Sequence, residues 1–245
     1  MKIIKNLIVI VVSVFLILGL TSLEAASEKS NSSFTEFKYK NFTKINASGI
    51  WEVNIKRGEK YKIIVYSSAE MKDYIAVDKV NDILYLKTKT RPWAWFKKTT
   101  DADRLRVEIT MPYFEKLEAS GECKVNFSDF NLGIFNIDIS GKVKVTCANN
   151  KITNLFIESS GESSVVCKSK INNLSIEASG TSDLDFKSST VLNANVYLNG
   201  TSKVILKMRG GNLNGNLSGD SSLTYEGKIK TQNVLISGSG TVIKK

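Results

Sequence analysis

The residues of this sequence that could do chemistry are carboxylates, lysines, aromatics and cysteines, because the chain contains no histidine. Histidine is the commonest general base and metal ligand, so its absence weakens any catalytic or metal-centred hypothesis. Four carboxylates recur at intervals of 20, 20 and 19 residues: Glu118, Asp138, Glu158 and Glu177. Stacked in space, they would form an outward-facing acidic stripe that could bind a sugar or a cation such as Ca²⁺. The alternative, which we favour, is a solvated face whose charge is balanced by Lys116, Lys142 and Lys144.

A second set of residues would suit a polysaccharide lyase. Asp183 and Asp185 are two positions apart and would face the same side of a strand, and Lys203 follows one repeat later. Lyases built on parallel β-helices use carboxylates for Ca²⁺ and a basic residue to abstract a proton, a role that Lys203 could take. Nothing in the spacing singles out these residues. We therefore expect no catalytic residues, no metal site and no cofactor.

A predicted loop places two of the three tryptophans beside basic residues: Arg91, Trp93, Trp95, Phe96, Lys97 and Lys98. Aromatic and cationic side chains together suit glycans, lipid head groups or a protein partner. In the interpretation that we prefer, the aromatics instead fold back as an apolar lid over one end of the fold. The loop is kept as a candidate ligand or partner surface.

Residues 1–26 predict a secretory signal peptide. Lys2 and Lys5 precede an uncharged apolar run over residues 7–20, and Ala25 and Ala26 follow at the expected cleavage site. The run is shorter than the ~20 residues that a membrane-spanning helix needs, and no later run is long enough. We expect an exported chain without a transmembrane segment once processed, located in the periplasm, at the cell surface or outside the cell.

The charge of the chain points to an acidic partner. With 34 basic and 24 acidic residues, the net charge is +10. Such an excess favours contact with acidic envelope polymers or anionic lipid head groups, and nucleic acid, the usual alternative, fits poorly with export. We expect an envelope glycan or an envelope protein as the partner, and no nucleic acid.

The element that would position these residues is a repeat of about 20 residues. From residue 117 onward, a Ser-Gly or Asn-Gly pair recurs seven times, at Gly121, Gly141, Gly161, Gly180, Gly200, Gly219 and Gly240. The fourth residue after each of the first six glycines is valine or leucine: Val125, Val145, Val165, Leu184, Val204 and Leu223. Polar residues alternate with these apolar ones, which indicates a strand with one apolar face on each side of the glycine.

Two short strands joined by a glycine turn cannot fold alone, because each has one apolar face and open edges. Stacking solves both problems, since each strand then pairs in parallel with its equivalent in the next coil. Leucine-rich repeats have a similar period, but they need a leucine-rich strand, an asparagine ladder and a helical return, which we do not find here. The sequence predicts an all-β fold with a repeat β-solenoid over residues 117–245.

Residues 27–116 predict an N-terminal strand region that begins the solenoid and then interrupts it with inserted hairpins. An earlier copy of the repeat lies at residues 42–53 and matches residues 114–125 position by position. Strand-like segments follow at residues 61–66, 83–86 and 105–111, with a turn near Asn81 and Asp82. We interpret them as an antiparallel cap over one end of the solenoid.

The three cysteines are Cys123, Cys147 and Cys167, an odd number that leaves at least one thiol unpaired. Cys147 and Cys167 fall at equivalent inward positions of adjacent coils. A disulfide in that parallel geometry is usually strained. We therefore interpret both residues as buried free thiols that pack as small apolar side chains.

The opening Phe42-x-x-Ile45-x-Ala47-Ser48-Gly49, the segment 75–89 and the later Ser-Gly coils together resemble the head GIN domain family, also described as auto-transporter adhesins. The resemblance covers roughly residues 34–245. It implies a right-handed parallel β-helix, similar in shape to pectin lyases, in exported bacterial proteins. It also implies a role in cell adhesion and no recognised catalytic residues.

These observations favour an exported, non-catalytic envelope or surface protein that presents its solenoid for binding or adhesion. One alternative is a polysaccharide-active enzyme of pectate-lyase-like fold. Another is a periplasmic partner in an envelope-stress or regulatory system.

Overall fold

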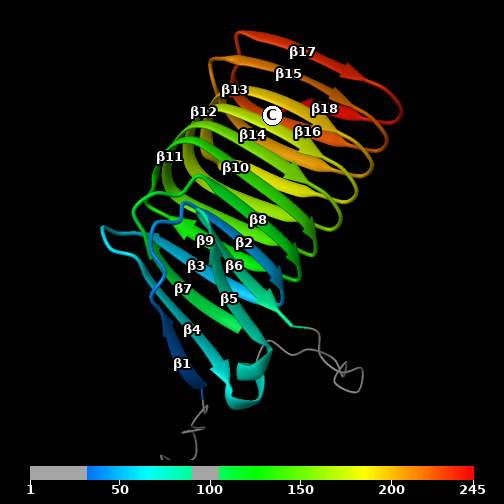
Figure 1. The fold of residues 1–245 in the computed structure, drawn as a ribbon. Coiled ribbons are helices and arrows are strands. Elements are labelled where there is room, and N and C mark those ends of the chain that lie inside the picture. Colours follow the sequence, from blue (N-terminus) through cyan, green and yellow to red (C-terminus); the bar gives the residue numbers. More distant parts are fainter. Residues whose placement is uncertain (1–31, 90–104) are drawn as a thin grey trace, which may run out of the picture. The chain divides into compact units, whose positions relative to one another are not determined.

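A computed structural model describes residues 32–89 and 105–245, and this part of the chain forms one sheet of 18 strands (Figure 1). Its single helical element is a short 3-10 helix, η1 (Ala69–Tyr74). The described residues contain no helix that is long and apolar enough to cross a membrane. The predicted signal peptide and the tryptophan loop at residues 91–98 lie outside the described residues.

The strands are, in chain order, β1 (Ser32–Phe37), β2 (Lys44–Gly49), β3 (Trp51–Arg57), β4 (Lys62–Ser68), β5 (Ile75–Val80), β6 (Ile83–Thr88), β7 (Leu105–Met111), β8 (Lys116–Gly121), β9 (Lys124–Ser128), β10 (Asn131–Gly141), β11 (Lys144–Ser159), β12 (Ser164–Ala178), β13 (Asp183–Leu198), β14 (Lys203–Arg209), β15 (Asn212–Leu217), β16 (Ser222–Lys228), β17 (Thr231–Ile236) and β18 (Thr241–Lys244). Nearly all of them pair in parallel with the equivalent strand one coil away (Figure 1). The predicted β-solenoid is therefore confirmed.

Each coil has two walls that meet at the glycine turn. We call them the pre-glycine wall, formed by strands such as β8, β10 and β15, and the post-glycine wall, formed by strands such as β9, β14 and β16. The long strands β11, β12 and β13 start on the post-glycine wall and bend at a register shift onto the pre-glycine wall of the next coil.

The core consists of ladders of equivalent side chains. Val125, Val145 and Val165 are in register on successive coils. Leu184, Val204 and Leu223 continue the same ladder. All six are fully buried, whereas their neighbours along the strand are exposed or partly exposed, apart from Thr224. The alternation predicted from the repeat therefore sets the interior of the solenoid.

The last glycine turn differs from the sequence prediction. Gly238, and not Gly240, has the positive φ of the turn glycines, and it stacks on Gly219. The strand register agrees, because Ile236 pairs with Leu217. The final coil is thus two residues shorter than we predicted. Gly238 and Gly240 each follow a serine, so the sequence alone allowed either glycine to be aligned with the earlier turns.

The N-terminal region is only partly antiparallel. β4 pairs antiparallel with β7 and β5 antiparallel with β6, as predicted for the inserted hairpins. However, β6 and β7 themselves pair in parallel with β2 and β3, so they form a coil of the solenoid. On their other side, β2 and β3 pair with β8 and β9. The coil formed by β2 and β3 therefore lies between two others. The coil of β6 and β7 lies on one side of it, and the coil of β8 and β9, followed by the rest of the solenoid, lies on the other side.

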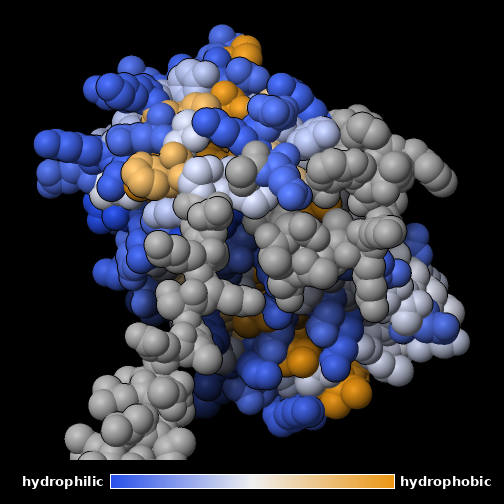
Figure 2. Space-filling model, turned by 90° about the horizontal axis from the view of Figure 1, so that it is seen from below, coloured by the Kyte–Doolittle hydropathy of each residue, from blue (hydrophilic) through white to orange (hydrophobic). Residues whose placement is uncertain are grey.

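The antiparallel strands protect the edges of the β6 and β7 coil from pairing with another chain. Seen from this end, the described surface is mainly hydrophilic, with hydrophobic residues in small separate areas (Figure 2). The structure thus closes the stack at the N-terminal side with strands β4 and β5.

The cysteine prediction is wrong in one respect. Cys147 and Cys167 are buried as expected, but they form a disulfide. They are direct partners in the parallel register, and their Cα atoms are 4.7 Å apart, which lies inside the range that a disulfide can bridge. Cys123 is buried and takes no part in this disulfide; its thiol lies against the carbonyl oxygens of Gly49 and Ser120.

Candidate binding groove

A groove of about 740 Å³ runs along the outside of the pre-glycine wall. Two outward columns line it. The first contains the four predicted carboxylates, together with Asn46, Tyr197 and Asn216. The second contains hydroxyl and amide side chains next to the turn: Ser120, Ser140, Ser160, Ser179, Asn199 and Ser218. The groove therefore presents the same polar chemistry on successive coils.

The parallel register places the four carboxylates in one column. Glu118 pairs with Asp138, Asp138 with Glu158, and Glu158 with Glu177. Asn46 precedes Glu118 on one side, and Tyr197 follows Glu177 on the other. The arrangement is a line along the stack, and no group of three potential metal ligands converges among the described residues. The geometry thus suits an elongated ligand better than a chelated ion.

One end of this column is neutralised by the protein itself. The Lys116 Nζ atom lies 2.7 Å from Glu118 and 2.6 Å from Asp138. Asn46 also donates a hydrogen bond to Glu118. The hydrogen bond from Lys116 is the main reason why the pKa of Glu118 lies below its ordinary value. Conversely, Asp138 and then Glu118 raise the pKa of Lys116.

The other lysines that we expected to balance the stripe do not contact it. Lys142 lies 4.0 Å from Glu162, in the turn. Lys144 belongs to the post-glycine wall, where it is in register with Lys124. The reason is that the glycine turn reverses the direction of the chain, so the residues that follow it belong to the post-glycine wall and do not line the groove. Within the part of the chain that the structure describes, Glu158 and Glu177 form no ion pair.

The lyase-like residues lie on the post-glycine wall, away from the groove. Asp183 and Lys203 are in register on adjacent coils, as the spacing predicted. Asp185 forms an ion pair of 3.0 Å with Lys187 and also accepts a hydrogen bond from its backbone N–H. None of these side chains lines the groove.

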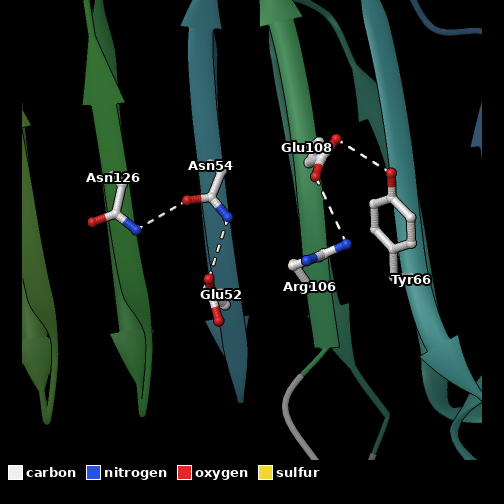
Figure 3. Close-up of polar contacts among 6 residues, drawn as sticks. All are labelled: Glu52, Asn54, Tyr66, Arg106, Glu108 and Asn126. Carbon is white, nitrogen blue, oxygen red and sulfur yellow. Dashed lines mark hydrogen bonds and ion pairs between the residues drawn. The ribbon is translucent and has the colours of Figure 1, made fainter. Parts of the chain in front are cut away.

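The outer face near the N-terminal end of the post-glycine wall is held by its own polar contacts (Figure 3). Asn126 donates to Asn54, which donates in turn to Glu52. Further along, the hydroxyl of Tyr66 donates to Glu108, which also lies 3.8 Å from Arg106. These contacts join β9 to β3 and β4 to β7, so they stabilise these two strand pairs.

The sequence analysis missed two features of the pre-glycine wall. Asn173 donates to Asn154 at 2.8 Å, and Asn193 donates to Asn173 at 3.0 Å, which makes an exposed amide ladder beside the groove. A second ladder joins Asn214 to Asn195. The asparagines recur at the repeat spacing, so the sequence contains the signal for these ladders, although the described residues lack the leucine-rich strand and helical return of leucine-rich repeats.

The second missed feature is a set of exposed apolar and aromatic side chains. Ile134, Phe156, Tyr197 and Leu235 are all exposed, and all four occupy outward positions of the pre-glycine wall. Phe156 and Tyr197 leave 45% and 49% of their surface exposed, so part of each aromatic side chain is accessible to a ligand. This wall therefore combines carboxylates, amides, hydroxyls and aromatics.

The fold is that of a parallel β-solenoid with a polar groove along one wall. The chain belongs to the family described as "Putative auto-transporter adhesin, head GIN domain", whose model matches residues 41–208. Membership of this family implies an exported or surface protein with an adhesin-like role. None of the curated proteins compared matches the sequence.

Solved structures share the fold. A putative adhesin from Bacteroides fragilis is similar with a TM-score of 0.78 and 16% identity, over 89% of this chain and 98% of that chain. A putative adhesin from Parabacteroides merdae has a TM-score of 0.67 and 16% identity, over 89% and 97%. A putative lipid binding protein from Parabacteroides distasonis has a TM-score of 0.65 and 16% identity, over 89% and 98%. At this identity the likeness shows the fold alone.

Proposed function

We propose that this chain is an exported, non-catalytic, adhesin-like protein that binds an extended envelope glycan along the groove of the pre-glycine wall. The family description supports the adhesin-like part of the proposal. The glycan part is supported by the chemistry of the groove, which offers hydrogen-bonding side chains and the exposed ring of Tyr197, and by Phe156, which is exposed on the same wall.

The observation that carries the proposal is the repetition of equivalent groups along the groove. From Asn46 to Asn216 the column crosses seven successive coils. At ~4.8 Å per coil, six steps give a length of about 29 Å. A polymer made of repeating hydroxylated units can meet equivalent partners at each step. A compact ligand would use only a small part of this surface.

The aromatic residues supply the apolar part of such a site. Sugar rings have apolar faces that pack on aromatic side chains, while their hydroxyls hydrogen-bond to carboxylates and amides. Tyr197 follows Glu177 on the same column, and Phe156 lies on β11 two residues before Glu158. Both rings thus stand beside the carboxylates.

A glycan array with the purified protein tests the proposal. We expect binding to linear glycans, and a loss of roughly tenfold or more in the Phe156→Ala and Tyr197→Ala double variant. Tyr113→Ala is the matched control, because Tyr113 is also an exposed aromatic residue but lies between β7 and β8, outside the groove. Absence of glycan binding by the wild type, or equal losses in the groove and control variants, would contradict the proposal.

The tryptophan loop remains a second candidate surface by its sequence alone. The Trp93→Ala and Trp95→Ala double variant, measured on the same array and in an envelope pull-down, tests whether that loop contributes. Binding equal to that of the wild type would remove the loop from the proposed binding surface.

A further inference from the structure

We propose that the groove selects a cationic glycan, a linear polymer of amino sugars whose ammonium groups pair with Glu158 and Glu177. This inference rests on the proposed function and goes further, because it names the substrate class and the half of the groove that recognises it. The family description and the similar structures indicate no ligand charge.

The first argument is the uneven charge along the column. Lys116 neutralises Glu118 and Asp138 at one end. Glu158 and Glu177 are exposed, lie directly opposite each other on neighbouring strands, and have no ion pair within the described residues. Like charges that face each other across a strand pair repel. A cation placed between them would relieve this repulsion, and an ammonium group fits because it donates three hydrogen bonds.

The second argument is the contrast between the groove and the rest of the chain. The protein carries a net charge of +10, so a polycation is repelled by most of its surface. The equivalent outward ladder of the post-glycine wall contains three lysines and one carboxylate, in the order Lys124, Lys144, Ser164, Asp183 and Lys203. The pre-glycine wall instead exposes an acidic column along a groove. Charge complementarity therefore directs a cationic chain to this groove and away from the opposite wall.

The third argument is the exposed aromatic ring next to the acidic pair, which suits a ligand whose units carry both an apolar face and an ammonium group. The ring of Tyr197, one coil beyond Glu177, can pack on a sugar ring.

The test compares two probes that differ only in charge: a hexamer of β-1,4-linked glucosamine and its fully N-acetylated form. Binding is measured in mildly acidic buffer, which protonates the sugar amines. We expect the wild-type protein to bind the amino form at least tenfold more tightly, with an affinity that falls as salt increases.

Variants then locate the recognition. Glu158→Gln with Glu177→Gln should weaken binding of the amino hexamer by about tenfold or more and weaken binding of the acetylated hexamer much less, because the glutamine amides still offer hydrogen bonds to sugar hydroxyls. Lys116→Met should strengthen binding of the amino hexamer, because it frees Glu118 and Asp138. Glu162→Gln is the matched control, since this exposed carboxylate lies outside the groove, and it should change nothing. A thermal melt of each variant confirms that it is folded.

The outcomes separate this inference from the proposed function. Equal affinity for the two hexamers, or binding of neutral glycans alone, overturns the inference and leaves the proposed function standing. Failure to bind any glycan overturns both. Tighter binding of oligolysine than of the amino hexamer overturns the inference in favour of a cationic peptide partner.

Discussion

Gly121 stacks directly on Gly49, so that a Cβ atom added to Gly121 would lie 2.7 Å from the Gly49 carbonyl oxygen. The same relation recurs one coil further, where a Cβ on Gly141 would lie 2.9 Å from the Gly121 carbonyl oxygen. Both glycines also have positive φ, +84° and +85°. The Ser-Gly repeat therefore reflects two constraints at once: the conformation of the turn and the close approach of successive turns.

Replacement of a stacked glycine should destabilise the fold. For Gly141→Ala we expect a loss of about 1–3 kcal/mol in the free energy of unfolding, because the left-handed backbone and the clash with the next turn both disfavour a side chain. Gly133→Ala is the control, since a Cβ there would meet no atom within 4 Å, and its effect should stay within about 0.5 kcal/mol. Urea unfolding measures both, and similar values for the two variants would argue against the stacking constraint.

The disulfide gives a second prediction. Cys147 and Cys167 enclose a loop of 20 residues, and its closure should contribute about 3 kcal/mol to the free energy of unfolding. Reduction, or replacement of both cysteines by valine, should lower stability by an amount of that order. Thiol titration of the unfolded, non-reduced protein should find a single reactive thiol, that of Cys123, because Cys147 and Cys167 are joined.

Cys123→Ser is the control for that experiment. Ser163 lies at the equivalent position of a later coil, where its hydroxyl donates to backbone carbonyl groups, so a serine should fit at position 123. The variant should be close to the wild type in stability and still respond to reductant. Three free thiols in the non-reduced wild-type protein would show that the disulfide does not form.

The repeat made much of the fold predictable from the sequence. Val125, Val145 and Val165 could be assigned to one buried ladder because every coil repeats the same apolar position. The same periodicity predicted that Glu118 and Asp138 would be neighbours in one column. Stacking requires the alternation of apolar and polar residues and the fixed repeat length in every coil. Both can therefore be recognised in the sequence alone.

Features that depend on long-range placement were not predictable in the same way. Spacing did not show that β6 and β7 join the parallel stack, because their order in space differs from their order in the chain. The partners of Lys142 and Lys144 also depend on where the turn ends and on which wall each side chain lies. The pairing of Cys147 with Cys167 depended on the exact in-register geometry of two coils.

The inward and outward assignment of adjacent residues gives a third prediction. Val165 is fully buried in the core ladder, whereas Val166, the next residue, faces outward on β12. Val165→Ala should lower the free energy of unfolding by about 2 kcal/mol, through lost burial and a cavity. Val166→Ala should change it by about 0.5 kcal/mol or less. A larger loss for Val166→Ala than for Val165→Ala in urea unfolding would reverse the assigned faces.

The ion pairs of Lys116 give the last prediction, which concerns pH. Because Lys116 lowers the pKa of Glu118, the ionised carboxylate stabilises the folded state. This contribution is fully present above the ordinary glutamate pKa of 4.5 and is lost as the pH falls through the lower folded-state pKa. Since the groups are partly exposed, we expect a contribution of about 0.2–1 kcal/mol near neutral pH.

Lys116→Met should therefore raise the titration midpoint of the Glu118 carboxyl carbon in an NMR titration. It should also remove part of the stability near neutral pH, and the difference from the wild type should shrink in acid, where Glu118 is protonated in both proteins. Lys142→Met removes the same charge from a lysine that pairs with Glu162 instead, so it should leave the Glu118 midpoint unchanged. Equal shifts of the midpoint in the two variants would mean that net charge, and not the contact with Lys116, sets the pKa of Glu118.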